Sequence, residues 1–242
     1  MNNHQGYQIR RSSRAKRLRI VVTADKVEAV APLRMPERKI HQFMRIRAGW
    51  VEAAKNEVQQ HVDSVTSLAP ASYQQGALIP YQGAQYKLQI YMTREKQIKI
   101  AFEQCFTAYV PECISKDLNQ RELSQQIQSA LISWMGQEAA KQAAAYADKY
   151  APMYKLTPRS ISIKAQKSRW GSCGIHNDIN LNWLLILAPA AVFEYVLIHE
   201  LCHIEQRNHS AAFWALVARH CPDYQQQRGW LKRYGASLML GL

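Results

Sequence analysis

The sequence lacks the features that mark exported and membrane-spanning proteins. Its five cysteines are odd in number and form no CxxC pair, which argues against a disulfide framework and against a zinc site made of cysteines alone. The first residues, MNNHQGYQIRR, contain no apolar segment typical of a signal peptide. The longest apolar run, WLLILAPAAVF at 183–193, is shorter than a membrane span and contains Pro189. We therefore expect a cytoplasmic protein with no membrane association.

Several common functional motifs are also missing. The chain has no Walker loop, no GxGxxG fingerprint and no evident Ser/His/Asp set, and it shows neither internal repeats nor low-complexity tracts. Its hydrophobic content of 48% and charged content of 20% are those of an ordinary globular protein, which excludes wholesale disorder. A length of 242 residues accommodates one large domain or two small ones.

Acidic residues are scarce near the N-terminus. Residues 1–50 hold twelve Lys or Arg but only Asp25, Glu28 and Glu37, so this segment carries +9 of the total net charge of +13. A basic region of this kind attracts phosphates, acidic proteins or anionic lipid through its electric field. Nucleic acid or a nucleotide is thus a candidate partner, and a solvated basic surface with no dedicated partner is the alternative.

Hydrophobic periodicity predicts a mixed order of strands and helices. The expected strands are a hairpin at 18–22 and 27–31, two short, half-buried antiparallel strands at 85–92 and 97–103, and two further strands at 160–165 and 178–183. The expected helices are 36–62, 115–150 ending at Pro152, 189–206, 210–221 and 222–235 ending at Gly235. This order favours an α+β fold with a basic, β-rich region with one helix at 1–110 and a second domain at 111–242.

The segment HELCHIEQRNH at 199–209 contains three histidines, two glutamates and a cysteine. Residues four apart lie on one face of a helix, so His199 and His203 can bind one metal ion together. Glu200 lies about 100° around the helix from His199, so its carboxylate lies beside such an ion rather than on it. This arrangement is typical of a zinc hydrolase, in which the carboxylate acts as general base toward a zinc-activated water.

A catalytic zinc ion needs a third protein ligand, and few candidates follow His203. His209 is favoured, because a helix that breaks after Arg207, with Asn208 in a left-handed turn, would bring it back toward the pair. His220 and Asp223 remain alternatives. The spacing matches that of metzincins, except that Gln206 stands where those enzymes have a turn glycine. The expected cofactor is Zn²⁺, with another divalent metal as the alternative.

The motifs RWGSC, DINLNW, HELCH and NHSAAFW together resemble the YgjP-like family of metal-dependent hydrolases, which are of zincin type. The similarity extends to YQIRRSSRAKRLRIVV, VEAVAP and GALIPYQGAQYKLQI, so it covers most of the chain. It implies a zincin-like core, in which an edge strand near 179–183 runs over the active-site helix. It also implies that His199, His203 and His209 bind the metal and that Glu200 is the catalytic base. The pattern is similar as well to SprT-like and spartan-like proteases, which act near DNA.

Arg169 and Trp170 precede this expected edge strand. One interpretation is that both line the cleft, with Arg169 facing an anionic substrate or a developing oxyanion. The other is that Trp170 packs under the helix while Arg169 pairs with a nearby carboxylate.

Three functions are consistent with the sequence. The first is a zinc metallopeptidase that acts on peptides, with Glu200 as general base. The second uses the same centre to hydrolyse phosphoanhydrides of nucleoside triphosphates, with the basic N-terminal region and Arg169 clamping the phosphates. The third is a non-catalytic, nucleic-acid-associated protein with a structural metal, although such a site has no use for Glu200. No pattern in the sequence indicates an oligomeric state.

Overall fold

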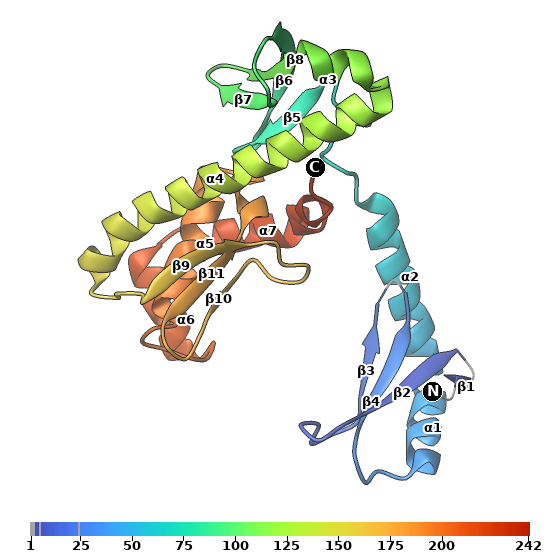
Figure 1. Cartoon of the computed structure of the whole chain (residues 1–242). Helices are drawn as coiled ribbons and strands as arrows, with labels where there is room; N and C mark the ends of the chain where they lie inside the picture. Colours follow the sequence, from blue (N-terminus) through green and yellow to red (C-terminus); the bar gives the residue numbers. More distant parts are fainter. Residues whose placement is uncertain (1–2, 5, 24) are drawn as a thin grey trace. The chain divides into compact units, whose positions relative to one another are not determined.

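The structure is a computed structural model that describes residues 3–4, 6–23 and 25–242 (Figure 1). Its mixture of separate sheets and helices confirms the α+β fold class. The contacts divide the chain into two compact units, Met1–Thr66 and Ser67–Leu242, rather than at the expected position after residue 110. The division falls earlier because the strands between residues 78 and 111 share one continuous hydrophobic core with the C-terminal helices. Among the described residues, no helix combines the length and apolar character needed to cross a bilayer.

The first unit is a four-stranded sheet with two helices, in the strand order β1-β2-β4-β3. Its elements are β1 (Asn3–His4), β2 (Tyr7–Ser12), β3 (Arg19–Val22), β4 (Val27–Pro32), α1 (Glu37–Ile46) and α2 (Ala48–Ser64). The predicted hairpin is confirmed as the antiparallel pair β3 and β4. The single helix expected over 36–62 is instead two helices, because Arg47 leaves the helical conformation at φ −98° and ψ 9°.

The second unit begins with a sheet in the order β5-β6-β8-β7, followed by the short helix α3. Its elements are β5 (Leu78–Tyr81), β6 (Ala84–Thr93), β7 (Lys99–Phe102), β8 (Phe106–Pro111) and α3 (Glu112–Asp117). The segments expected to be antiparallel strands, 85–92 and 97–103, correspond to β6 and β7, which run in opposite directions but are not neighbours in the sheet. Strand β8, which was not predicted from the sequence, lies between them and pairs parallel with β6 and antiparallel with β7.

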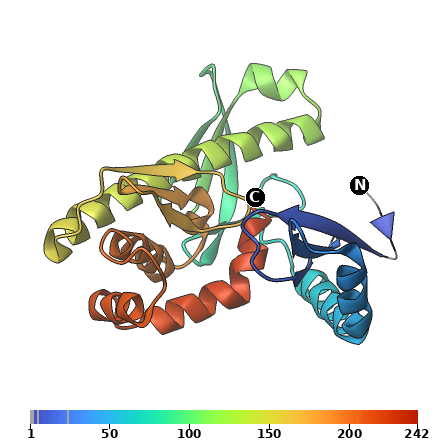
Figure 2. The same ribbon diagram turned by 90° about the horizontal axis from the view of Figure 1, so that it is seen from below.

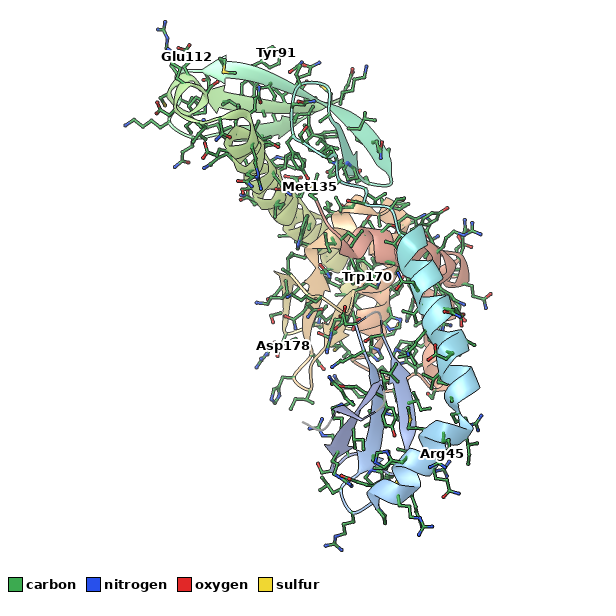
Figure 3. All side chains as sticks on the ribbon, turned by 90° about the vertical axis from the view of Figure 1, so that its right-hand side faces the viewer. Arg45, Tyr91, Glu112, Met135, Trp170 and Asp178 are labelled. Atoms are coloured by element: carbon green, nitrogen blue, oxygen red, sulfur yellow. The ribbon has the colours of Figure 1, made fainter. Side chains whose placement is uncertain are left out.

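The N-terminal end of helix α4 (Gln120–Tyr154) lies at the sheet β5-β6-β8-β7, and the C-terminal end of the helix lies at β9 and α5 (Figure 1). It starts at a capping box in which Asn119 and Glu122 each bond the other's backbone N–H. It buries a stripe of residues four apart, including Ile127, Leu131 and Met135, the last labelled in Figure 3. Pro152 does not stop the helix, which continues to Tyr154 and ends where Lys155 adopts a left-handed conformation.

The remaining elements form a small three-stranded sheet and a group of helices on one side of it (Figure 2). They are β9 (Ser160–Lys164), β10 (Gly171–Cys173), β11 (Asp178–Asn182), the 3₁₀ helix η1 (Trp183–Leu187), α5 (Ala190–Cys202), α6 (Ala211–His220) and α7 (Tyr224–Met239). Helix α7 passes through Gly235, which was expected to end it. A Cβ atom at Gly235 would lie 3.2 Å from the Trp170 ring, so the glycine serves this close packing.

The strand expected at the edge of this sheet is its central strand. The order is β10-β11-β9, so β11 pairs antiparallel with β10 and parallel with β9. Arg159 and Ser160 both donate hydrogen bonds to Asp178, which ties β9 to β11 and holds the pKa of that carboxyl below its usual range. The exposed edge near α5 therefore belongs to β10, whose three residues, GSC, were too few to show a strand periodicity.

Candidate metal centre

Helix α5 carries His199 and Glu200 and ends at Cys202, so His203 is its C-cap residue. The backbone of His203 stays in the right-handed helical region, at φ −67° and ψ −15°, so the spacing of four still places its ring beside that of His199. The two ring centroids lie 4.9 Å apart. The helix thus ends well before Arg207, where the break was expected, without disturbing the histidine pair.

His209 returns to this pair from the loop between α5 and α6. Its Nε2 atom lies 3.0 Å from the Nε2 atom of His199, and one ring nitrogen from each of the three histidines lies within 4.8 Å of the other two. No other group of three potential metal-ligating residues occurs among the residues that the structure describes. His220 instead stacks on Tyr154, with the ring centroids 3.7 Å apart, and Asp223 is the N-cap residue of α7.

The loop reaches this position without the left-handed turn expected at Asn208. Asn208 does not have a positive φ angle, and its side-chain oxygen accepts a hydrogen bond from the backbone N–H of Ser210. Ser210 then caps α6 by accepting from the N–H of Phe213. The loop is therefore shaped by two side-chain caps rather than by backbone conformation.

Packing and one hydrogen bond orient the histidine rings. The Nδ1–H group of His203 donates to the carbonyl of Gln206 at 2.9 Å, which leaves Nε2 with a free lone pair. The same ring stacks on Phe213 at a centroid distance of 4.4 Å, and the His209 ring stacks on Trp214 at 5.6 Å. Burial lowers the pKa of His203 and lowers that of His199 to about 3, so both rings are neutral near pH 7. Three converging imidazoles, of which those of His199 and His203 are held neutral by burial, fit a divalent metal ion of the zinc type.

Glu200 is buried beside this cluster, directly under strand β10. Its side chain is 5% exposed, and burial raises the pKa of its carboxyl to about 8, while the charge of Arg169 opposes the shift. Gly171 covers the carboxyl so closely that a Cβ atom there would lie 2.5 Å from Oε1 and 2.7 Å from Cγ. Only glycine leaves room for Glu200 at this position, a constraint that was not recognised from the sequence.

Arg169 and Trp170 lie in the segment that leads into β10. The buried side chain of Asn182 holds this segment by donating hydrogen bonds from Nδ2 to the carbonyls of Gln166 and Arg169. Arg169 is exposed and forms no ion pair with any described residue, so the expected pairing with a carboxylate does not occur. Trp170 combines the two interpretations, because it packs against the core and also lines a cavity shared with His199 and Glu200.

The sequence matches the model of a known protein family. The family model described as "YgjP-like, metallopeptidase domain" matches residues 16–234. The chain belongs to the YgjP-like family. The match spans most of both compact units, so the basic first unit is part of the family's domain. No curated protein and no solved structure gives a significant match.

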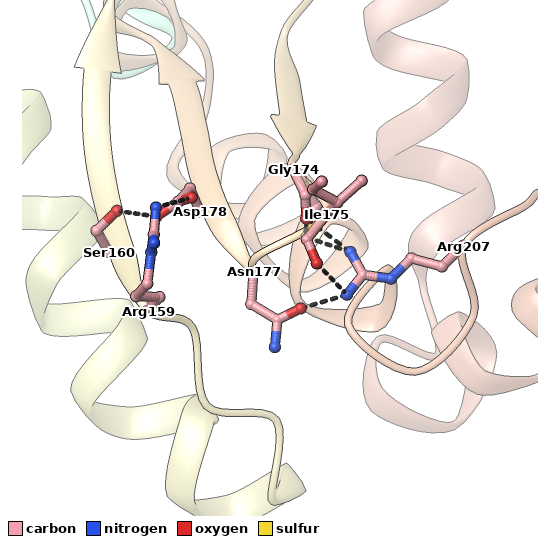
Figure 4. A network of polar contacts seen from close by, with 8 residues as sticks. Arg159, Ser160, Gly174, Ile175, Asn177, Asp178 and Arg207 are labelled. Carbon is pink, nitrogen blue, oxygen red and sulfur yellow. Dashed lines mark hydrogen bonds and ion pairs between the residues drawn. The ribbon is translucent and has the colours of Figure 1, made fainter.

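In this YgjP-like chain, Arg207 holds the His209 loop in place, a role that was not predicted from the sequence. Figure 4 shows its guanidinium reaching the turn between β10 and β11, where it donates to the carbonyls of Gly174 and Ile175 and to the side chain of Asn177. The distance from Nη1 to the Gly174 oxygen is 2.7 Å. Arg207 thus ties the loop that carries His209 to the hairpin that covers Glu200.

Replacing Arg207 by Ala is expected to lower metal affinity by about 10-fold, within the range found when groups that support metal ligands are removed. Without the guanidinium, the loop has more conformations, and His209 must be ordered again when the metal binds. Competition with a chromophoric chelator measures the affinity. The matched control is Arg219→Ala on α6, which removes an exposed arginine outside the loop. Equal affinities for the two variants would contradict a positioning role for Arg207.

Proposed function

We propose that this YgjP-like chain is a zinc-dependent metallopeptidase with a zincin-like core. The observation that carries the proposal is the convergence of His199, His203 and His209 beside the buried carboxyl of Glu200. The family description, a metallopeptidase domain, supports the same reaction class. Three protein ligands are the number that catalytic zinc sites use, because they leave one coordination position for water or substrate.

Each of these residues has a distinct part in the proposed reaction. When bound, zinc acts as a Lewis acid and lowers the pKa of a water molecule to near 7. Glu200 accepts the proton from the attacking water and delivers it to the leaving amine. Its buried position keeps bulk water away from this proton, and a cation held by the histidines would favour its charged form, against the effect of burial. The unpaired edge of β10 can bind an extended peptide as an additional strand.

The proposal is tested with zinc-loaded protein and a panel of unfolded proteins, peptides and nucleoside triphosphates. We expect release of peptide fragments from the first two, and a loss of about 10²- to 10⁴-fold in rate for Glu200→Gln, which removes the general base. The variant should retain its zinc, as checked by metal analysis of both proteins. Release of phosphate or pyrophosphate in place of peptides, lost in the same variant, would assign the centre to phosphoanhydride hydrolysis.

We also propose that the first unit associates with nucleic acid. Its twelve Lys and Arg side chains within residues 1–50 are all exposed, and only Arg10, Arg11 and Lys26 form ion pairs among the described residues. The others are available to phosphates. Binding to duplex or single-stranded DNA should weaken steeply as salt increases. Replacing Arg14, Arg17 and Arg19 together by Glu should abolish binding at 0.15 M salt, and a variant that binds as tightly as the natural chain would contradict the proposal.

A further inference from the structure

A cavity of about 370 Å³ opens next to His199 and Glu200. Its walls come from three parts of the second unit, namely the start of β10, helix α5 and helix α7. The residues that line it besides His199 and Glu200 are Trp170, Gly171, Tyr195, Val196, Arg228, Leu231 and Lys232. The volume lies within the range of small-ligand and side-chain pockets. A substrate whose scissile bond lies at the histidine cluster can therefore place a neighbouring group in this cavity.

The cavity lining contains two cationic side chains, Arg228 and Lys232. Arg228 and Lys232 are four residues apart on α7, so both point toward the same side of that helix. Neither forms an ion pair with any residue that the structure describes. Glu200, the proposed base, is the single acidic residue in the lining. Two cations without an ion-pair partner beside the histidine cluster attract an anionic group of the substrate.

Arg228 is held in place by aromatic stacking. Its guanidinium carbon lies 4.6 Å from the centre of the Trp214 ring, and that ring also stacks with the rings of Tyr224 and His209. A cation–π contact leaves the N–H donors of a guanidinium available for hydrogen bonds. The contact therefore holds Arg228, a potential two-pronged hydrogen-bond donor, near Trp214 and the candidate metal ligand His209.

The other walls suit a short hydrocarbon chain. Val196 and Leu231 provide aliphatic surface, and the rings of Trp170 and Tyr195 complete the lining. We propose that this cavity is a specificity subsite that binds a carboxylate of the peptide substrate, with Arg228 as the main recognition residue and Lys232 as its support. The inference rests on the proposed peptidase function. The carboxylate can come from a Glu or Asp side chain next to the scissile bond, or from the C-terminus of the peptide.

Matched peptides test this subsite in the zinc-loaded, full-length protein. One series carries Glu or Gln at each position beside the scissile bond with an amidated C-terminus, and a second carries Gln with a free C-terminal carboxylate. A charge-assisted hydrogen bond contributes about 1.5–3 kcal/mol, so we expect kcat/KM to be about 10- to 100-fold higher for one carboxylate-bearing series than for its neutral counterpart. The series that shows the preference identifies the source of the carboxylate.

Substitutions on α7 then assign the preference to the cavity. Arg228→Gln should reduce the ratio of kcat/KM between the carboxylate-bearing and the neutral peptides to within about threefold of one. Lys232→Gln should reduce this ratio partly. The matched control, Arg233→Gln, removes a charge from the same helix outside the cavity and should leave the ratio unchanged. Should Arg228→Gln fail to fold, the Lys232→Gln variant still decides the question. Equal kcat/KM for all peptides, or a preference that neither substitution changes, would overturn the subsite.

A binding measurement separates this inference from the proposed function. N-acetylglutamate and N-acetylglutamine are titrated into the zinc-loaded Glu200→Gln variant, which should not turn over substrate. One outcome is that N-acetylglutamate binds more tightly than N-acetylglutamine, that Arg228→Gln removes this difference, and that the natural chain cleaves no peptide. This outcome would support the carboxylate subsite and reject the peptidase function. Peptide cleavage without any acidic preference would keep the peptidase and reject the subsite. Displacement of N-acetylglutamate by micromolar nucleoside triphosphate would show a phosphate site and also reject it.

Discussion

Replacement of Gly171 by Ala is expected to lower peptide hydrolysis by about 10²-fold or more while the protein retains its metal, because it displaces the base rather than the ligands. The new methyl group would lie 2.5 Å from Oε1 of Glu200, 2.7 Å from Cγ and 2.9 Å from Cδ. No Cβ atom tolerates such contacts, so either the Glu200 carboxyl or strand β10 must move. Glu200 is 5% exposed and has little room to move elsewhere.

A nearby glycine provides the control for this substitution. Gly174→Ala would place its Cβ atom 3.6 Å from the carbonyl oxygen of Asp178, which is an ordinary van der Waals distance. It should therefore leave kcat close to that of the natural chain. Metal analysis and kinetics of both variants decide the outcome. A Gly171→Ala protein as active as Gly174→Ala would show that the position of the Glu200 carboxyl does not matter for turnover.

Replacement of His209 by Ala should lower metal affinity by more than about 100-fold, beyond the usual effect of losing a supporting partner. The substitution leaves His199 and His203 as the remaining pair from the cluster, and two ligands are fewer than catalytic zinc sites use. Equilibrium dialysis followed by metal analysis measures the occupancy. At metal concentrations that saturate the natural chain, the variant should lose peptide hydrolysis together with its bound metal.

His220→Ala is the matched control for the ligand assignment. His220 was one of the alternative third ligands, but its ring stacks on Tyr154 outside the histidine cluster. Its loss should lower stability slightly and leave the metal stoichiometry unchanged. Full metal occupancy in His209→Ala, or loss of metal in His220→Ala, would contradict the proposed ligand set.

The predictions that depended on local spacing agree with the structure. His199 and His203 lie four residues apart on a helix, and this relation is set by backbone geometry before any tertiary contact forms. His209 lies beside them, as elimination among the downstream residues had favoured, although the loop reaches them without the expected turn. That these three histidines bind a metal stays a prediction.

The features that the sequence did not reveal depend on contacts between distant segments. The closeness of Gly171 to Glu200 arises from packing of β10 on α5, and the link from Arg207 to Gly174 joins residues 33 positions apart. The central strand was mistaken for the edge strand because β10 is three residues long and shows no alternation. Gly235 was expected to end α7, but it lies inside the helix because the Trp170 ring occupies the space of a side chain.

The hairpin of β10 and β11 serves as a common support for two chemically different groups. At one end Gly171 sets the position of the Glu200 carboxyl. At the turn, Gly174, Ile175 and Asn177 accept hydrogen bonds from the arginine that anchors the His209 loop. A displacement of this hairpin would therefore alter proton transfer and metal retention together. Variants that displace the whole hairpin, turn included, should lose both properties in parallel, whereas a local change at one end, such as Gly171→Ala, should separate them.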